Sequence, residues 1–215
     1  MSTSPSRVTI PGAQGLALAA TYDPPGVENS PAVLLLHMYG TDRRSWEPFS
    51  AELTGAGIAS LAIDLRGHGE TGGAEEWQLA QQDVAAAFEW LRRAPGVDPT
   101  RVGIVGASIG ANLALVQAAS YPSEVAAAAL LSPGMDYFRV KIDGLAQEAR
   151  GVPLFLAASE GDGYSAETVS ILAEEAAANH ELSVFAGASH GTEMLAEHPQ
   201  LAGKLISFLL DAFAE

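Results

Sequence analysis

Short, continuously apolar runs alternate with longer alanine-rich segments along most of the chain, and this alternation is the feature that most constrains the fold. Strands covered by helices on both faces have unbroken apolar runs, because neither face meets water. We expect eight strands, at residues 6–10, 16–22, 32–37, 58–63, 101–105, 126–131, 152–158 and 182–186. Two opening antiparallel strands followed by β-α-β units predict an α/β fold, with a mostly parallel sheet of about eight strands and helices on both faces.

The segments between the strands have helical periodicity. Residues 75–93 carry an apolar side chain at every third or fourth position, which predicts one buried helical stripe. Its members are Ala80, Val84, Phe88 and Leu91. Further helices are expected directly after Gly110, at 165–179 with Ser165 as the N-cap, and near 199–213. The last of these places Leu201, Leu205, Phe208 and Leu209 on one face.

Composition narrows the class of protein. A chain of 215 residues without a linker or repeat is expected to form one domain, 1–215. Its net charge of −15 argues against nucleic acid and anionic membranes as partners, because both attract clusters of Lys and Arg. The absence of cysteine excludes disulfides and a catalytic thiol. We expect a soluble cytoplasmic protein, monomeric or a small homo-oligomer; secretion with removal of a leader stays open.

Two pentapeptides, GASIG at 106–110 and GASHG at 187–191, match the G-x-S-x-G pattern of serine nucleophiles. The first follows a β-rich run and precedes a helix of small residues, the order that a nucleophile elbow requires. It therefore places Ser108 at a helix N-terminus, where backbone N–H groups stabilise an oxyanion. The second is followed only by a short helical stretch, and Ser189 is expected to be a turn residue. Ser108 is the predicted nucleophile.

The expected partners of Ser108 stand at the ends of later strands, where open α/β sheets bind their ligands. Asp162 lies in the loop after 152–158, and His190 follows the last strand. In this chain order His190 would be the general base, and Asp162 would orient its imidazole. Asp136 follows the preceding strand and stays open as an alternative acid.

Four motifs in this order resemble small α/β-hydrolases of the dienelactone hydrolase-like and bacterial carboxylesterase type. They are LLLHMYGTDRRSW at 34–46, DLRGHGET at 64–71, GASIGA at 106–111, and ASEGD with GASHGT at 158–162 and 187–192. The resemblance implies Ser108, Asp162 and His190 as catalytic residues. It also implies an oxyanion hole formed by the backbone N–H groups of Tyr39 and Ile109.

Two departures from the family pattern bear on chemistry. Met38 stands where glycine usually follows the histidine, which puts a bulky side chain near the oxyanion hole. The nucleophile of dienelactone hydrolases is cysteine, which this chain lacks, so the resemblance favours serine-ester chemistry.

Other polar and aromatic residues are given structural roles. His37 and His68 are expected to bond neighbouring loops, and Arg43 and Arg44 to solvate a loop. His180 and His198 are expected at the surface near helix ends. Trp46, Trp77 and Trp90 are expected in or near the core.

The expected function is hydrolysis of small, short-chain carboxylic esters through an acyl-enzyme. No cofactor or metal is expected, because no cluster has metal-ligand spacing and no phosphate loop accompanies a lysine. Only about 20 residues separate the strands at 126–131 and 152–158, too few for a large cap domain. They are expected to form a small lid over a shallow apolar pocket, whose predicted lining is Met38, Met135, Tyr137 and Phe138. A thioesterase and a catalytically idle ligand-binding module stay open as alternatives.

Overall fold

One twisted sheet forms the centre of the computed structural model, which describes residues 4–176 and 179–214. Its strands are β1 (Ser6–Pro11), β2 (Ala17–Asp23), β3 (Ser30–Leu36), β4 (Ala59–Ile63), β5 (Val97–Ala107), β6 (Ala128–Leu131), β9 (Leu154–Ser159) and β10 (His180–Phe185). Their order across the sheet is β1-β2-β4-β3-β5-β6-β9-β10. The pairings from β4 through β10 are parallel, and β1 and β2 are antiparallel to their neighbours, so the predicted α/β architecture is confirmed.

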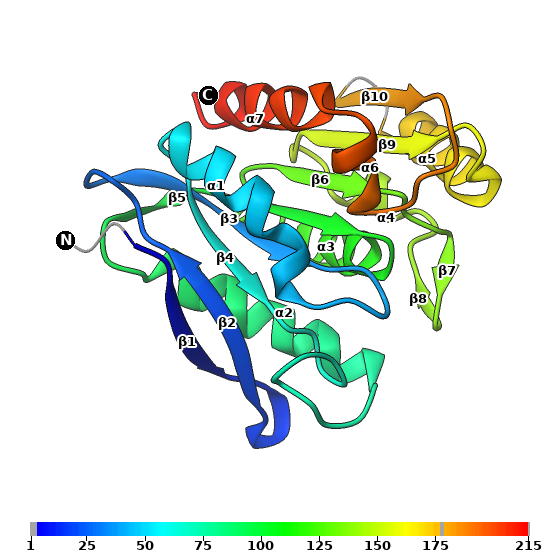
Figure 1. Cartoon of the computed structure of the whole chain (residues 1–215). Helices are drawn as coiled ribbons and strands as arrows, with labels where there is room; N and C mark the ends of the chain where they lie inside the picture. Colours follow the sequence, from blue (N-terminus) through cyan, green and yellow to red (C-terminus); the bar gives the residue numbers. More distant parts are fainter. Residues whose placement is uncertain (1–3, 177–178, 215) are drawn as a thin grey trace.

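Helices cover both faces of the sheet (Figure 1). One face packs against α2 (Trp77–Arg92), α3 (Ile109–Ser120), α4 (Leu145–Glu148) and α5 (Gly163–Ala176). The other packs against α1 (Glu47–Gly55), α6 (Glu193–Glu197) and α7 (Gln200–Ala212). Short 3-10 turns, η1 (Ala13–Gly15) and η2 (Arg43–Trp46), precede β2 and α1.

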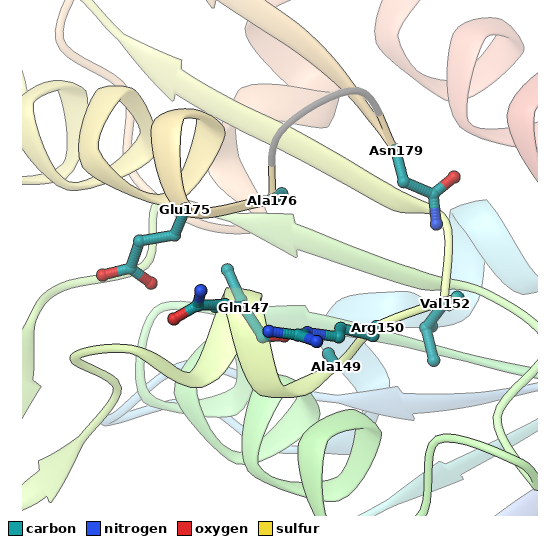
Figure 2. Close-up of a pocket in the computed structure, with 9 residues that line it drawn as sticks. Gln147, Ala149, Arg150, Val152, Glu175, Ala176 and Asn179 are labelled. Carbon is teal, nitrogen blue, oxygen red and sulfur yellow. The ribbon is translucent and has the colours of Figure 1, made fainter.

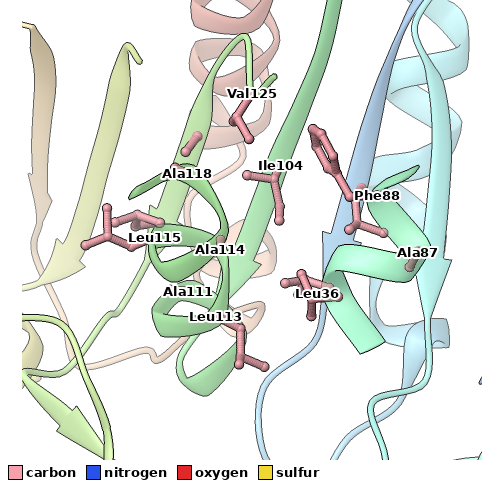
Figure 3. Packing of buried hydrophobic residues seen from close by; sticks show 14 of the residues in the cluster. Leu36, Ala87, Phe88, Ile104, Ala111, Leu113, Ala114, Leu115, Ala118 and Val125 are labelled. Atoms are coloured by element: carbon pink, nitrogen blue, oxygen red, sulfur yellow. The ribbon is translucent and has the colours of Figure 1, made fainter. Parts of the chain in front are cut away.

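The larger core layer lies between the sheet and helices α2 and α3. Figure 3 shows Phe88 of α2 near Ile104 of β5, with the small side chains Ala111, Ala114 and Ala118 along α3. Alanines let this helix lie close to the strands, which fixes the position of its first turn. The stripe predicted for residues 75–93 is buried at all four positions, and so is the apolar face of α7.

The expected helix at 165–179 differs at its start. The helix α5 begins at Gly163, so Ser165 lies inside its first turn and is fully buried rather than an N-cap. Residues 177–178 of that expected helix lie outside the described residues. The helix α1 and its preceding turn were not expected from the sequence.

The segment between β6 and β9 forms no large cap. It contains a two-stranded hairpin of β7 (Asp136–Tyr137) and β8 (Val140–Lys141), followed by the single turn of α4. Strands of two residues are too short to show an alternating apolar pattern, so the sequence predicted a small lid here but not the hairpin.

The expectation that Arg43 solvates a loop was wrong. Its guanidinium is buried and pairs with the buried carboxylate of Asp64, and it also contacts Glu70 at 3.1 Å. The Arg43 amide donates to Asp64 Oδ1 at 2.8 Å, so this pair ties the segment after β3 to the segment after β4. Arg44 pairs with Asp42 at the surface.

The tryptophans follow expectation, since Trp46 and Trp77 are buried and Trp90 is half-buried. His180 and His198 are less exposed than expected, because both are half-buried and His198 stacks on Phe185. Among the described residues, no helix combines the length and apolarity needed to span a bilayer.

Candidate active site

Ser108 lies at the junction between β5 and α3, in a backbone conformation that an L-residue rarely adopts. Its φ and ψ are 54° and −121°, and its side chain is buried. The Ser108 amide donates to Leu131 O at 2.8 Å, and its carbonyl accepts from the amide of Ala111 at 2.8 Å. The strained serine is therefore held by β6 on one side and by the first turn of α3 on the other, as in a nucleophile elbow.

The flanking glycines allow the strand and the helix to approach each other. A Cβ at Gly106 would overlap the carbonyl of Gly110, and a Cβ at Gly110 would overlap the Leu36 carbonyl and lie 2.7 Å from His37 O. The second contact brings the end of β3 against the first turn of α3. It therefore places the loop that carries Tyr39 beside Ile109, whose N–H has no intrahelical partner because it is the first helical residue.

The Met38–Tyr39 peptide has its carbonyl held from three directions. Met38 O accepts from His37 Nδ1 at 2.7 Å, from Thr41 Oγ1 at 2.9 Å and from the Thr41 amide at 3.4 Å. In a planar trans peptide the N–H points opposite to the C=O. The Tyr39 N–H is therefore directed away from these donors, the orientation that an oxyanion-hole donor needs.

His190 pairs with Asp162. Its Nδ1 lies 2.6 Å from Asp162 Oδ2, and both side chains are only partly exposed. Asp136 is turned elsewhere, because its carboxylate accepts from the Arg139 amide at 2.8 Å within the β7–β8 hairpin. Of the two acids considered from the sequence, the structure brings Asp162 to the histidine.

Two buried serines hold the backbone on either side of His190. Ser159, at the end of β9, donates to Ser189 O at 2.8 Å, and its Oγ lies 3.1 Å from Ser189 Oγ. Ser132, just after β6, accepts from the Gly191 amide at 2.9 Å. The sequence reading of Ser189 as only a turn residue missed this contact. Nothing in the sequence marked Ser132 or Ser159, because their partners lie 59 and 30 residues away.

The four predicted pocket residues do not line one common pocket. Met38 packs under the His190 loop, where its Sδ would be 2.8 Å from a Cβ at Gly191, and Met135 packs against the core. Tyr137 lies edge-to-face with the His190 ring at 6.3 Å. Phe138, at the hairpin tip, is half-exposed, and its ring lies 4.9 Å from that of Tyr39. Tyr39 lies in the segment 37–41 after β3, which we call the oxyanion loop because it carries the expected N–H donor.

An aromatic cluster surrounds that hairpin tip. Phe138 stacks on Trp77 with ring centroids 5.0 Å apart, and its ring lies 4.9 Å from that of Tyr39. His68 lies edge-on to Tyr39 at 5.4 Å, and its Nδ1 contacts Arg66 O at 3.1 Å. The cluster gives this edge of the sheet an apolar surface that contacts both the hairpin and the oxyanion loop.

His37 joins two loops, as the sequence indicated. While Nδ1 donates to Met38 O, Nε2 accepts the Leu65 amide at 3.0 Å, which fixes the neutral tautomer. Burial lowers the pKa of His37 to about 4, against a smaller opposing effect of the bond to Met38 O. The ring is fully buried and so links the oxyanion loop to the end of β4.

A cavity of about 360 Å³ lies at the opposite edge of the sheet. Figure 2 shows Gln147 and Arg150 on one side of it, and Glu175 and Asn179 on the other. Val152 and Asn179 precede the amino ends of β9 and β10, whereas Asp162 and His190 follow their carboxyl ends. This cavity is therefore separate from the candidate site. Within residues 4–176 and 179–214, no group of three or more His, Asp or Glu side chains could hold a metal ion.

A mostly parallel sheet with a strained serine, an acid and a histidine at its carboxyl edge is the arrangement of α/β-hydrolases. A family model described as alpha/beta hydrolase fold matches residues 31–156, more than half of the chain, and the chain belongs to this family.

The chain is also similar in sequence to a curated protein and in fold to solved structures. An uncharacterized protein from Mycobacterium tuberculosis is 35% identical over 127 residues, which cover 59% of this chain and 44% of the relative. The chain thus spans less than half the length of that curated relative. An esterase from Pyrococcus furiosus superposes with a TM-score of 0.81 at 19% identity, covering 98% of this chain and 92% of that one. A dienelactone hydrolase from Anabaena variabilis superposes with a TM-score of 0.76 at 23% identity, covering 98% and 97%. At these identities the two structures show a shared fold.

Proposed function

We propose that this protein is a serine esterase that cleaves small carboxylic esters. The observation that carries the proposal is the 2.6 Å pairing of His190 with Asp162 at the same sheet edge as the strained Ser108. The three residues stand in the chain order of α/β-hydrolases. The likeness to the Pyrococcus furiosus esterase supports ester hydrolysis as the reaction.

The proposed mechanism uses the two nitrogens of His190 differently. Asp162 engages Nδ1, so Nε2 takes the Ser108 proton as Ser108 Oγ attacks the ester carbonyl. The N–H groups of Tyr39 and Ile109 stabilise the tetrahedral oxyanion. His190 then protonates the departing alcohol, and a water activated by the same imidazole releases the acid.

The short insertion between β6 and β9 supports small substrates. This insertion consists of a two-stranded hairpin and the single turn of α4, which is too short to form a larger cap. The half-exposed rings of Tyr39 and Phe138 offer an apolar surface for a short acyl group. We therefore propose short-chain acyl esters as the substrate class.

Covalent labelling tests the nucleophile. A fluorophosphonate is expected to modify Ser108, as located by peptide mass spectrometry, and Ser108→Ala should lose both the label and at least about 1,000-fold of p-nitrophenyl acetate hydrolysis. Folded protein without label would contradict the proposal and favour an idle binding module. Faster turnover of acetyl thioesters than of matched oxygen esters would instead identify a thioesterase.

Comparison of two acid variants tests the triad. Asp162→Asn should lower kcat by about 1,000-fold or more, because an amide no longer stabilises the imidazolium, whereas Asp136→Asn should retain most activity. The opposite result would assign the acid role to Asp136.

A further inference from the structure

The β7–β8 hairpin is attached to the helix that carries the nucleophile. Asn112, one helical turn after Ser108, is fully buried and makes three hydrogen bonds to backbone groups at Gly134, two residues before β7, and at Val140 in β8. Its Nδ2 donates to Gly134 O at 2.6 Å and to Val140 O at 2.8 Å, and its Oδ1 accepts from the Gly134 amide at 3.1 Å. Because one side chain of α3 holds both β8 and the segment that leads into β7, the hairpin has a fixed position relative to Ser108.

This attachment places Tyr137 beside the proposed triad. The half-buried ring lies edge-to-face with His190 at 6.3 Å and with Tyr164 at 5.7 Å. Its hydroxyl lies 3.3 Å from the Oγ of the buried Ser165. The Ser108 hydroxyl has a small lowering effect on the pKa of Tyr137. The Tyr137 ring therefore lies against the histidine of the proposed triad, and its hydroxyl lies at the first turn of α5, which follows Asp162.

Tyr137 and Phe138 lie on opposite sides of the candidate site. Phe138 contacts Tyr39 and thus lies on the side of the oxyanion loop, while Tyr137 lies against His190. In acyl transfer the carbonyl oxygen enters the oxyanion hole, and the leaving oxygen lies toward the histidine that protonates it. The side chain of Tyr137 is accordingly on the leaving-group side.

We propose that Tyr137 is a further catalytic residue, whose hydroxyl donates a hydrogen bond to the leaving-group oxygen of the ester. This inference rests on the proposed esterase function. In the step concerned, the bond between the carbonyl carbon and the alcohol oxygen breaks, and that oxygen receives the proton held by His190 Nε2. Tyr137 keeps its own proton throughout and stabilises the negative charge that develops on the oxygen before proton transfer is complete.

The protonation state of the phenol suits a donor. Burial raises the pKa of Tyr137 above its ordinary value of 10, so the hydroxyl keeps its proton at neutral pH. The nearby Asp162 carboxylate acts in the same direction, and the Ser165 and Ser108 hydroxyls act against it.

The proposal predicts a dependence on the leaving group. An alkoxide leaving group carries more charge per atom and needs more stabilisation than a p-nitrophenolate, which disperses its charge into the ring. Removing the Tyr137 hydroxyl should therefore impair alkyl esters more than activated aryl esters. We therefore expect Tyr137→Phe to raise the ratio of kcat/KM for p-nitrophenyl acetate to kcat/KM for ethyl acetate by about tenfold or more. This is the usual effect of losing one transition-state hydrogen bond.

The test measures kcat/KM, which reports acylation, for p-nitrophenyl, phenyl, trifluoroethyl and ethyl acetate. The matched control is Tyr164→Phe, which removes a neighbouring hydroxyl that accepts from the Asp136 amide at 2.9 Å. The slope of log kcat/KM against the pKa of the leaving alcohol should become steeper in Tyr137→Phe and stay unchanged in Tyr164→Phe. Because each slope compares substrates within one preparation, partial unfolding of a variant cancels.

The outcomes are distinguishable. Parallel lines for wild type and Tyr137→Phe, with wild-type Ser108 labelled by fluorophosphonate, would overturn the role of Tyr137 and leave the esterase proposal standing. Equal steepening in both tyrosine variants would also overturn it, because a general disturbance of the hairpin would then be the cause. An unlabelled Ser108 in folded wild type would overturn both proposals.

Discussion

Acidification should destabilise this protein through His37 before it affects the carboxylates with lowered pKa values. His37 is fully buried in its neutral form, with Nδ1 donating to Met38 O and Nε2 accepting from Leu65 N–H. A proton added at Nε2 would face the Leu65 N–H and abolish that bond. Protonation is thus penalised both by burial and by geometry.

The magnitude follows from the two pKa values. An unfolded histidine binds a proton near pH 6.5, whereas burial lowers the pKa of His37 in the fold to about 4. As the pH falls below 6.5 the unfolded state binds the proton first, so the free energy of unfolding decreases until the pH reaches about 4. At about 1.36 kcal/mol per pH unit, the full loss is on the order of 3 kcal/mol, a large part of a typical folding stability.

Urea unfolding followed by tryptophan fluorescence measures this effect between pH 8 and pH 4. His37→Gln is the matched variant, because glutamine keeps a donor and an acceptor but does not titrate. Asp42 and Asp98 have pKa values lowered to about 2 by hydrogen bonds, so the stability they add is lost below pH 3.8, outside this window. The wild-type stability should fall by about 3 kcal/mol relative to the variant from pH 6.5 to pH 4. Parallel curves for the two proteins would refute the reasoning.

Three further predictions concern the site and its supports. Gly110→Ala should destabilise the fold by about 4 kcal/mol or more, because its Cβ would meet the backbone of β3. Gly203→Ala should stabilise the fold by about 0.5–1 kcal/mol, because Gly203 lies in α7 and an added Cβ would have no neighbour within 4 Å. Differential scanning calorimetry compares the two variants, and equal effects would contradict the steric argument. Ser132→Ala should leave the Gly191 amide unpaired and lower kcat about tenfold, whereas Ser170→Ala, on the exposed face of α5, should have little effect in the same esterase assay. Equal activity of both serine variants would show that Ser132 does not position His190.

The sequence predicted the sheet well because its strands are buried on both faces. The observed strands β3, β4, β6 and β9 begin and end within two residues of their predicted bounds. The parts that were missed depend on partners far away in the chain. Arg43 was expected at the surface because its buried partner, Asp64, lies 21 residues further along the chain, where no local pattern connects the two. Ser165 looked like an N-cap because no local pattern indicated that Tyr137 would cover it.

In the candidate site, too, some features follow from local sequence and others depend on residues far away in the chain. The pairing of Asp162 with His190 could be predicted because both stand in loops that follow neighbouring parallel strands, whose carboxyl ends lie at one edge of the sheet. The orientation of the hairpin could not be predicted, since it depends on three hydrogen bonds from Asn112 to backbone groups 22 and 28 residues away. The place of Tyr137 beside His190 is therefore information that only the three-dimensional structure contains.

The two G-x-S-x-G pentapeptides show why a pattern match alone does not identify a nucleophile. In residues 106–110 the glycines leave space, because a Cβ at either position would overlap backbone, and the serine itself adopts the strained φ of 54°. In residues 187–191 the glycines supply left-handed turns, with φ of 98° and 58°. There Ser189 is tied to Ser159, and its neighbour His190 faces Asp162. The same five-letter pattern thus meets two different requirements, close packing of a strand on a helix and a turn that brings His190 to Asp162. In the proposed function only the first of these directs a serine hydroxyl toward substrate.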